Sequence, residues 1–375
     1  MTARGRRIGL VIGQLDRGGA ERQLATLAVQ LRTRGVAPAV FCLSALVEPW
    51  GSLLRDAGVS VEVIPRLAPF DPSRVLRLAW RFRSLRLDLA HSFVIDTNLY
   101  VVLAAALSRV PAVVTSNLNS DFPRDPVRRR LDRLAFLGGT GIWVNSEHVR
   151  FFTSDFFGVP AGRIAVVRQG VDTERFRPIV NHEEARRRVG IPGGLALGTV
   201  ASLTEKKAPW LFLEIAEALV REFDDLTVVH VGGGPLREAV EAWLARSPGR
   251  GRIRLLGPRD DVEQILPALD VFLLNSVYEG LPNVILEAMA CGVPVVAPDV
   301  GGCGELVRHG GAGFLVNRAS RDDLLAASRS LLADPALRDQ FGREARRLAV
   351  AEHSLAEMTD GMLALYEAAG LRASS

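Results

Sequence analysis

Two glutamates, Glu279 and Glu287, stand eight positions apart where the sequence pattern changes from strand to helix. Residues 270–274 form a short apolar run of the kind typical of a buried parallel strand. Glu279 therefore falls in the loop at the carboxyl end of that strand, and Glu287 about one turn into the following helix. Ligands of open α/β sheets bind at this end of the strands, so both carboxylates are placed to contact one.

The residues between the two glutamates indicate which chemical groups the ligand contains. Pro282 and Asn283 predict the start of the helix, and Gly292 predicts its end. The unpaired amides and partial positive charge of a helix start suit a phosphate group, whereas carboxylates are suited to accept hydrogen bonds from hydroxyls. A diphosphate between two hydroxyl-rich groups is a nucleotide sugar. The residues expected around the diphosphate are Gly280, Leu281, Pro282, Asn283 and Val284.

The stretch from Glu279 through Ala297, EGLPNVILEAMACGVPVVA, resembles the Glu-x7-Glu signature of retaining glycosyltransferases of family 4. The resemblance implies an α/β protein with the GT-B fold, in which two doubly wound parallel-sheet, Rossmann-like domains face each other across a cleft. It also implies that Glu279 binds sugar hydroxyls and serves in catalysis, that Glu287 binds the ribose, and that the anomeric configuration is retained.

Both lysines of the chain, Lys206 and Lys207, lie in one loop after the strand predicted at residues 195–201. An arginine-rich chain that keeps its lysines there indicates that a compact ammonium is wanted at this loop. By the resemblance, Lys207 binds the donor diphosphate and acts in catalysis, with Lys206 as the alternative. Ser202, also in the donor site, stands where the family usually has an arginine. Another cation must then compensate, or the donor is held differently.

Two further segments complete the expected donor site. Gly18 and Gly19 lie between the first predicted strand, residues 8–12, and a helix, where the lack of side chains lets the backbone approach a phosphate. By the resemblance, this glycine loop faces the donor phosphates across the cleft, and the base docks at the edge formed by Leu256 and Gly257.

The acceptor side follows the family pattern less closely. Family members often carry a histidine after the strand predicted here at residues 112–116, whereas this chain has Ser116 and Asn117. His91 ends another predicted strand, and its role is open between a structural and a functional one. The acceptor chemistry is therefore not carried over from the resemblance.

The length of 375 residues exceeds what one hydrophobic core usually organises, so two domains are expected. Alternating predicted strands and helices favour parallel, doubly wound sheets. We expect an acceptor-side domain at 1–178, a nucleotide-sugar-binding domain at 179–350, and a final helix at 351–375 that, by the resemblance, crosses back to the first domain.

The cysteines and the apolar runs predict where the protein works. Its three cysteines have neither metal-ligand spacing nor a disulfide framework, and no apolar run approaches the length of a membrane helix. We therefore expect a cytoplasmic protein. Cations and helix amides can stabilise a leaving diphosphate without a metal, so neither a metal nor another cofactor is expected.

The net charge of +4 is unevenly distributed. Residues 1–180 carry 25 Arg against 15 Asp and Glu, whereas residues 181–375 carry 21 Lys and Arg against 27 Asp and Glu. An anionic partner of the first half is one explanation, and an arginine-rich but merely solvated surface is the other. We predict peripheral association with an anionic membrane surface, at the inner face, through Arg77, Arg81 and Arg128. Nucleic acid is not expected, because no binding motif accompanies these arginines.

The sequence thus predicts a hexosyltransferase of polysaccharide biosynthesis that moves a sugar from a nucleotide-diphosphate sugar to a glycan or lipid-linked glycan. A nucleotide-sugar epimerase and a non-catalytic sugar-nucleotide-binding protein, which Ser202 makes conceivable, are the alternatives. A phosphorylase is disfavoured because it needs a pyridoxal-binding lysine, and the only lysines are Lys206 and Lys207. The base, the sugar and the acceptor are not specified by the sequence.

Overall fold

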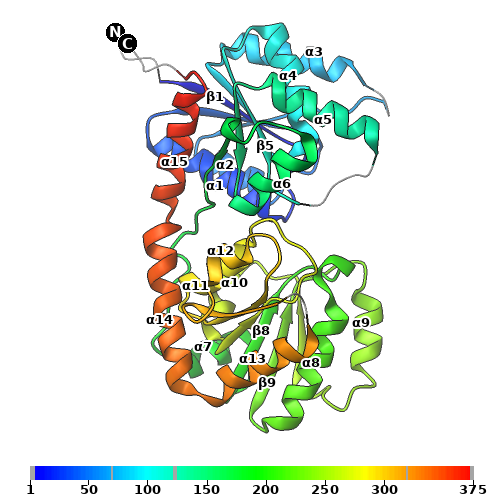
Figure 1. The fold of residues 1–375 in the computed structure, drawn as a ribbon, viewed down its shortest axis with the longest axis vertical. Helices are drawn as coiled ribbons and strands as arrows, with labels where there is room; N and C mark the ends of the chain where they lie inside the picture. Colours follow the sequence, from blue (N-terminus) through cyan, green and yellow to red (C-terminus); the bar gives the residue numbers. More distant parts are fainter. Residues whose placement is uncertain (1–4, 69–70, 121–124, 318–319, 372–375) are drawn as a thin grey trace. The chain divides into compact units, whose positions relative to one another are not determined.

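The structure is a computed structural model that describes residues 5–68, 71–120, 125–317 and 320–371. The chain forms two compact units (Figure 1). Unit 1 comprises residues 1–170 and 355–375, and unit 2 comprises residues 171–354.

The division between the units differs from the boundaries expected at 178 and 350. Residues that follow Gly170 belong to unit 2 because Val171 and Phe176 are buried in its hydrophobic core. The chain passes from unit 1 to unit 2 after Gly170 and returns to unit 1 after Ser354. The two connecting segments are hydrogen-bonded to each other, because the Val171 amide donates to the carbonyl of His353 at 2.8 Å.

Unit 1 is built on a seven-stranded parallel sheet with the strand order β3-β2-β1-β4-β5-β6-β7. Its strands are β1 (Arg7–Ile12), β2 (Ala37–Cys42), β3 (Ser60–Val63), β4 (Leu89–Ser92), β5 (Ala112–Asn117), β6 (Gly141–Val144) and β7 (Ile164–Val166). The central strands are buried, as strands covered on both faces must be, and β4 and β5 end in buried polar residues.

Helices cover both faces of this sheet. The core on one face includes residues of α1 (Gly19–Thr33), α2 (Trp50–Asp56) and α15 (Leu355–Ala368). Cores on the other face include residues of α3 (Ser73–Leu85), α4 (Ile95–Ser108), α5 (Pro126–Gly138) and α6 (Glu147–Phe157).

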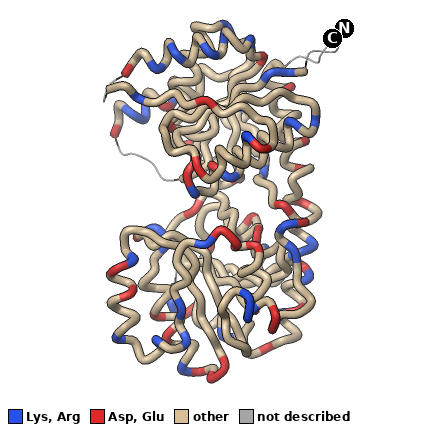
Figure 2. Tube along the Cα trace, turned by 180° about the vertical axis from the view of Figure 1, so that it is seen from behind, with Lys and Arg blue, Asp and Glu red and all other residues tan. Residues whose placement is uncertain are grey.

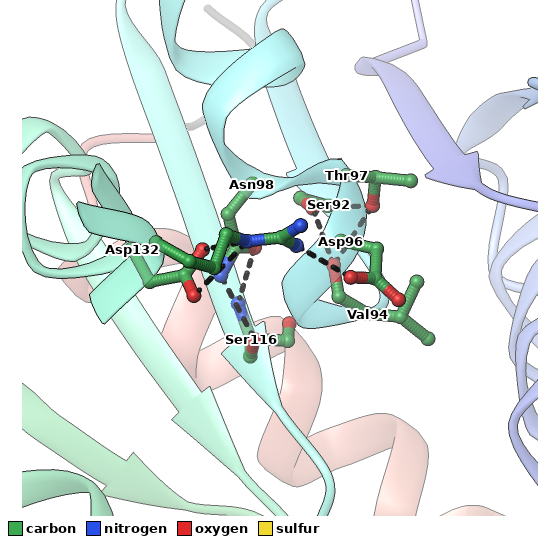
Figure 3. A network of polar contacts seen from close by, with 8 residues as sticks. Ser92, Val94, Asp96, Thr97, Asn98, Ser116 and Asp132 are labelled. Atoms are coloured by element: carbon green, nitrogen blue, oxygen red, sulfur yellow. Dashed lines mark hydrogen bonds and ion pairs between the residues drawn. The ribbon is translucent and has the colours of Figure 1, made fainter. Parts of the chain in front are cut away.

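A buried polar chain fastens the C-terminal helix α15 to this sheet. The hydroxyl of Tyr366 lies 2.7 Å from His91 Nδ1, and His91 Nε2 lies 2.8 Å from Ser116 Oγ. Burial lowers the pKa of His91 to about 3, so the imidazole is neutral. Asn98 on α4 pairs with both backbone groups of Ser116 (Figure 3). His91 is therefore a structural link, and Ser116 is held by it.

Unit 2 is built on a six-stranded parallel sheet with the order β10-β9-β8-β11-β12-β13. Its strands are β8 (Leu195–Val200), β9 (Leu226–Val231), β10 (Ile253–Gly257), β11 (Val271–Leu273), β12 (Val295–Pro298) and β13 (Gly313–Val316). Two doubly wound parallel sheets, as the sequence predicted, are confirmed.

The helices of unit 2 cover its sheet on both faces. They are α7 (His182–Val189), α8 (Pro209–Glu222), α9 (Arg237–Leu244), α10 (Val262–Ile265), α11 (Asn283–Ala290), α12 (Cys303–Val307), α13 (Arg321–Ala333) and α14 (Pro335–Glu352). The helix α13 ends before Asp334, and α14 begins directly after it. Asp334 caps the next helix by accepting a 3.0 Å hydrogen bond from the Leu337 amide, and Pro335 occupies its first position.

Among the described residues, no helix combines the length and the apolar character needed to cross a bilayer.

Candidate active site

The strand order of unit 2 reverses between β8 and β11, which creates a topological switch point. The two strands pair in parallel, with Leu197 opposite Val271. Their carboxyl ends therefore lie side by side, and the loops that leave them, residues 201–208 and 274–282, start next to each other. Open α/β sheets bind ligands at this position.

Side-chain and backbone hydrogen bonds join these two loops. Asn275 Nδ2 donates to the carbonyl oxygens of Lys207, at 2.8 Å, and Ala208, at 2.7 Å. The Val277 amide donates to the carbonyl of Lys206 at 2.9 Å. Because Asn275 is buried, these bonds are shielded from water and fix the lysine loop against the glutamate loop.

The two lysines of this loop have different partners. Lys207 Nζ forms an ion pair with Glu279 Oε1, and the two side chains are 20% and 8% exposed. Lys206 Nζ instead lies 4.4 Å from the centre of the Tyr278 ring, a cation–π contact. The sequence predicted that Lys207 and Glu279 share a site, but it did not predict their contact. This contact forms because the fold brings together two loops that are far apart in the sequence.

The backbone around Glu279 is held at the start of α11. Gly301 has φ +58°, and a Cβ added there would lie 2.0 Å from the Glu279 carbonyl oxygen. The amide of Gly302 donates to the Gly280 carbonyl at 2.6 Å. Pro282 precedes the helix, and its side chain makes no capping hydrogen bond. The partial positive charge of such a helix start attracts an anion.

Glu287 lies on α11 and is 3% exposed. Leu281 is buried, and Asn283 and Val284 at the helix start are half-buried. The first turn of α11 therefore lies nearer to solvent than Glu287 does.

Ser202 lies in the loop that follows β8, and Leu256 lies near the carboxyl end of β10, on the same edge of the sheet. Gly232, which follows β9, has φ +133°, and a Cβ there would lie 2.0 Å from the carbonyl oxygen of Ala201. Its amide donates to the Gly257 carbonyl at 2.8 Å, so the ends of β8, β9 and β10 are in direct contact. Ser202 is exposed and Leu256 is half-buried.

Arg237 is a residue of this edge that the sequence analysis did not single out. It begins α9 directly after the glycine loop that follows β9, and a Cβ at Gly257 would lie 3.3 Å from its Nη1. Its guanidinium also donates to Glu241 at 2.7 Å and is 47% exposed. The position of Arg237 at the start of a helix, just after the glycines 232–234, is the sequence pattern that could have indicated a place in the site.

Gly18 and Gly19 belong to unit 1, whereas the other predicted site residues belong to unit 2. Gly18 precedes α1 in an extended conformation, and Gly19 is its first residue. A Cβ at Gly18 would lie 2.1 Å from Glu21 Oε2, so this helix start already holds a carboxyl group. Burial raises the pKa of Glu21. A phosphate at this position would meet Glu21, which the sequence did not predict.

No set of three His, Cys, Asp or Glu side chains within the described ranges is arranged to hold a metal ion. A metal-free reaction stays a prediction.

Two family models match the chain, one in each half. The model described as Glycosyltransferase Family 4 matches residues 17–175, and the model described as Glycosyl transferases group 1 matches residues 194–334.

Curated relatives match at moderate identity. The D-inositol 3-phosphate glycosyltransferase of Corynebacterium urealyticum is 31% identical over 65% of this chain, and the match spans only 58% of that protein's length. The UDP-Gal:alpha-D-GlcNAc-diphosphoundecaprenol alpha-1,3-galactosyltransferase of Escherichia coli is 27% identical over 68% of this chain and 69% of its own length.

Solved structures share the fold over nearly the whole chain. HepE of Anabaena, in complex with UDP and glucose, matches with a TM-score of 0.85 at 21% identity, covering 95% of this chain and 98% of that chain. A glycosyltransferase of Rickettsia africae matches with a TM-score of 0.83 at 17% identity, covering 97% of this chain and 98% of that chain. The family matches and the shared fold together show that the chain belongs to glycosyltransferase family 4 and has the GT-B fold.

Proposed function

We propose that this protein transfers a hexosyl group from a nucleoside-diphosphate sugar to a glycan or lipid-linked glycan, with retention of the anomeric configuration. The observation that carries the proposal is the Lys207–Glu279 pair at the β8–β11 switch point, next to the start of α11. A cation, a helix start and a carboxylate converge there, which suits a diphosphate that carries a sugar.

The diphosphate is proposed to lie against the backbone amides of Leu281 to Val284 and the ammonium of Lys207. A lysine ammonium has three N–H donors, so Lys207 can keep its bond to Glu279 and still donate to a phosphate oxygen. The pair thus holds the cation in place before the donor arrives. Such a preorganised charge stabilises the leaving diphosphate by roughly 2–4 kcal/mol in the transition state.

The two glutamates are proposed to bind hydroxyls at opposite ends of the diphosphate. Glu279 accepts from the transferred sugar, and its negative charge steadies positive charge at the anomeric carbon. Glu287, deeper on α11, accepts from the ribose. Arg237 is proposed to supply the cation that Ser202 does not, because its guanidinium lies beside Gly257 on the same edge.

The acceptor is proposed to be a lipid-linked intermediate of polysaccharide biosynthesis. The name of the Escherichia coli relative describes an acceptor of this kind, a GlcNAc-diphosphoundecaprenol. An enzyme with a lipid-linked acceptor must reach the membrane that contains the lipid. We therefore propose a cytoplasmic protein that associates peripherally with the inner face of the membrane.

Incubation with a panel of nucleoside-diphosphate sugars tests the activity. We expect one donor to raise the melting temperature, since binding to the folded state alone stabilises it, and to be slowly hydrolysed to sugar and nucleoside diphosphate. A melting shift with neither hydrolysis nor transfer would favour the non-catalytic binding protein. Conversion of the donor to an isomeric nucleotide sugar would favour the epimerase, and no response to any donor would contradict the proposal.

A further inference from the structure

The outer surfaces of α3, α4 and α5 in unit 1 expose large apolar side chains. Their exposed fractions run from 37% for Leu137 to 65% for Trp80. The set comprises Leu76, Trp80, Leu103, Leu107, Val127, Leu131, Leu134 and Leu137. In the described part of unit 2, the exposed large apolar residues are Val180, Val277 and Val350, on separate elements. Unit 1 also exposes large apolar residues outside these helices, namely Leu46, Leu53, Val63, Leu67 and Phe151. The three helices therefore carry one group of such residues on adjacent elements.

These side chains share one surface, which we call the α3–α5 face. The three helices lie side by side, with α4 in contact with both neighbours (Figure 1). Val102 of α4 packs closely on α5, where a Cβ at Gly138 would lie 2.7 Å from its Cγ1. Each helix turns other residues toward the sheet, such as Phe82, Val101 and Phe136. The exposed residues recur at spacings of three and four, so they lie on the opposite side of each helix.

One group of arginines near this face is already paired within the protein. Arg77 bonds Asp71 at 2.7 Å, and Arg81 bonds Glu62. Arg128 bonds Asp96 at 2.5 Å and Asp132 at 3.2 Å, and Figure 3 shows these two carboxylates on either side of the bridging guanidinium. These three arginines, which the sequence predicted to contact lipid, are paired with acidic groups of the region, and their contact with lipid stays a prediction.

A second group of arginines, on α3 and α5 or directly after α3 and α4, is exposed. Figure 2 shows basic positions recurring along the helices of unit 1. None of the second group forms an ion pair with any residue that the structure describes. This group comprises Arg83, Arg86, Arg109, Arg130 and Arg133. The α3–α5 face therefore combines exposed leucines and a tryptophan with uncompensated positive charge.

We infer that the α3–α5 face docks on an anionic lipid bilayer. Apolar side chains interleaved with cations match a surface whose headgroups are negative and whose interior is hydrocarbon. Trp80 suits the headgroup level, because its ring is apolar and its N–H polar. A second copy of the chain is disfavoured, because a symmetric contact would bring the uncompensated arginines together. The inference rests on the proposed function for its lipid-linked acceptor, but docking itself requires no catalysis.

Vesicle sedimentation of the full-length protein tests the docking. We expect pelleting with phosphatidylcholine–phosphatidylglycerol vesicles at low salt, much less at high salt, and much less with phosphatidylcholine alone. The triple variant R83S/R130S/R133S should bind the anionic vesicles at least roughly tenfold more weakly. The matched control R246S/R250S/R343S removes three exposed arginines of unit 2 and should bind like the parent.

The apolar part of the face is tested with W80S/L134S, which should also pellet less. All variants should keep the melting temperature and the donor hydrolysis of the parent in solution, which separates docking from catalysis. Retention of the parent protein in the supernatant, or equal losses in the two triple variants, would overturn the inference. So would a dimer in sedimentation without lipid that W80S/L134S converts to a monomer, because the face would then join two copies.

Discussion

The two units have the same architecture but use their polar groups differently. At the switch point of unit 2, Lys207 and Glu279 form an ion pair at the carboxyl ends of the strands, and Glu287 is buried on α11. In unit 1, the buried residue His91 bonds both Tyr366 and Ser116. In our proposal the first set binds the donor, whereas the second set holds the helix α15 in place.

The outer surfaces of the units also differ. Unit 1 exposes apolar and basic side chains together on α3, α4 and α5. The half of the sequence that contains most of unit 2 carries more acidic than basic residues. Two units with the same fold thus differ in the residues at the ends of their strands and on the outer surfaces of their helices. In our account, unit 2 binds the donor and unit 1 approaches the acceptor.

Removal of Glu287 is the strongest test of the polar site in unit 2. Glu287→Ala should weaken nucleoside-diphosphate-sugar binding by at least roughly a hundredfold, because two hydroxyl bonds to a carboxylate contribute about 1.5–3 kcal/mol each. Isothermal calorimetry measures the loss. Glu287→Gln reports whether the fold tolerates a change here, and Glu238→Ala, an exposed glutamate of the same unit, serves as the control. Unchanged affinity in Glu287→Ala would remove this residue from the site.

The two lysines offer a matched pair within one loop. Lys207→Ala should lower kcat by roughly 30- to 1000-fold, the equivalent of about 2–4 kcal/mol of transition-state stabilisation. Lys206→Ala loses mainly its contact with the Tyr278 ring, which contributes about 0.5–1 kcal/mol. Steady-state donor hydrolysis compares them. Equal rates would mean that the pairing of Lys207 with Glu279 has no bearing on the leaving group.

Acid should destabilise both units through their buried histidines. Burial lowers the pKa of His91 to about 3 and that of His230 to about 4, against 6.5 for the free side chain. The unfolded chain therefore binds more protons below pH 6.5, so stability is full above that pH and falls as the pH decreases toward 4 and 3. For His91 alone, the loss between pH 7 and 5 is about 2 kcal/mol.

Chemical denaturation at several pH values measures this slope. His91→Gln should flatten it, whereas His182→Gln, at an exposed position, should not. An unchanged slope in His91→Gln would show that His91 does not stay neutral in the folded protein.

Metal removal should have the smallest effect. Donor hydrolysis after treatment with EDTA should proceed at the untreated rate, because Lys207 and the start of α11 supply the positive charge at the diphosphate. Restoration of a lost activity by a divalent cation would contradict this scheme and assign the leaving-group charge to a metal.

The sequence predicted the strands and the location of the site better than it predicted the contacts within it. Apolar runs such as residues 270–274 and the helix start at Pro282 and Asn283 are local patterns, and the structure confirms both. The pairing of Lys207 with Glu279 and of His91 with Tyr366 depends on segments far apart in the chain. Local periodicity contains no information on such contacts.

Charge patterns were similarly limited. The sequence identified the arginine-rich stretches of unit 1 but could not separate Arg81 and Arg128, which are paired, from Arg83 and Arg130, which are not. Helical spacing alone places all of them near the surface. Only the neighbouring acidic residues, brought from other elements by the fold, decide which arginines keep a free charge.

A crystal structure with a bound nucleoside-diphosphate sugar tests the central claim most directly. Our account predicts phosphate oxygens within hydrogen-bond distance of the first-turn amides of α11 and of Lys207 Nζ. It also predicts ribose hydroxyls on Glu287 and sugar hydroxyls on Glu279. A donor bound away from the β8–β11 edge, with Lys207 contacting Glu279 but no phosphate, would contradict it.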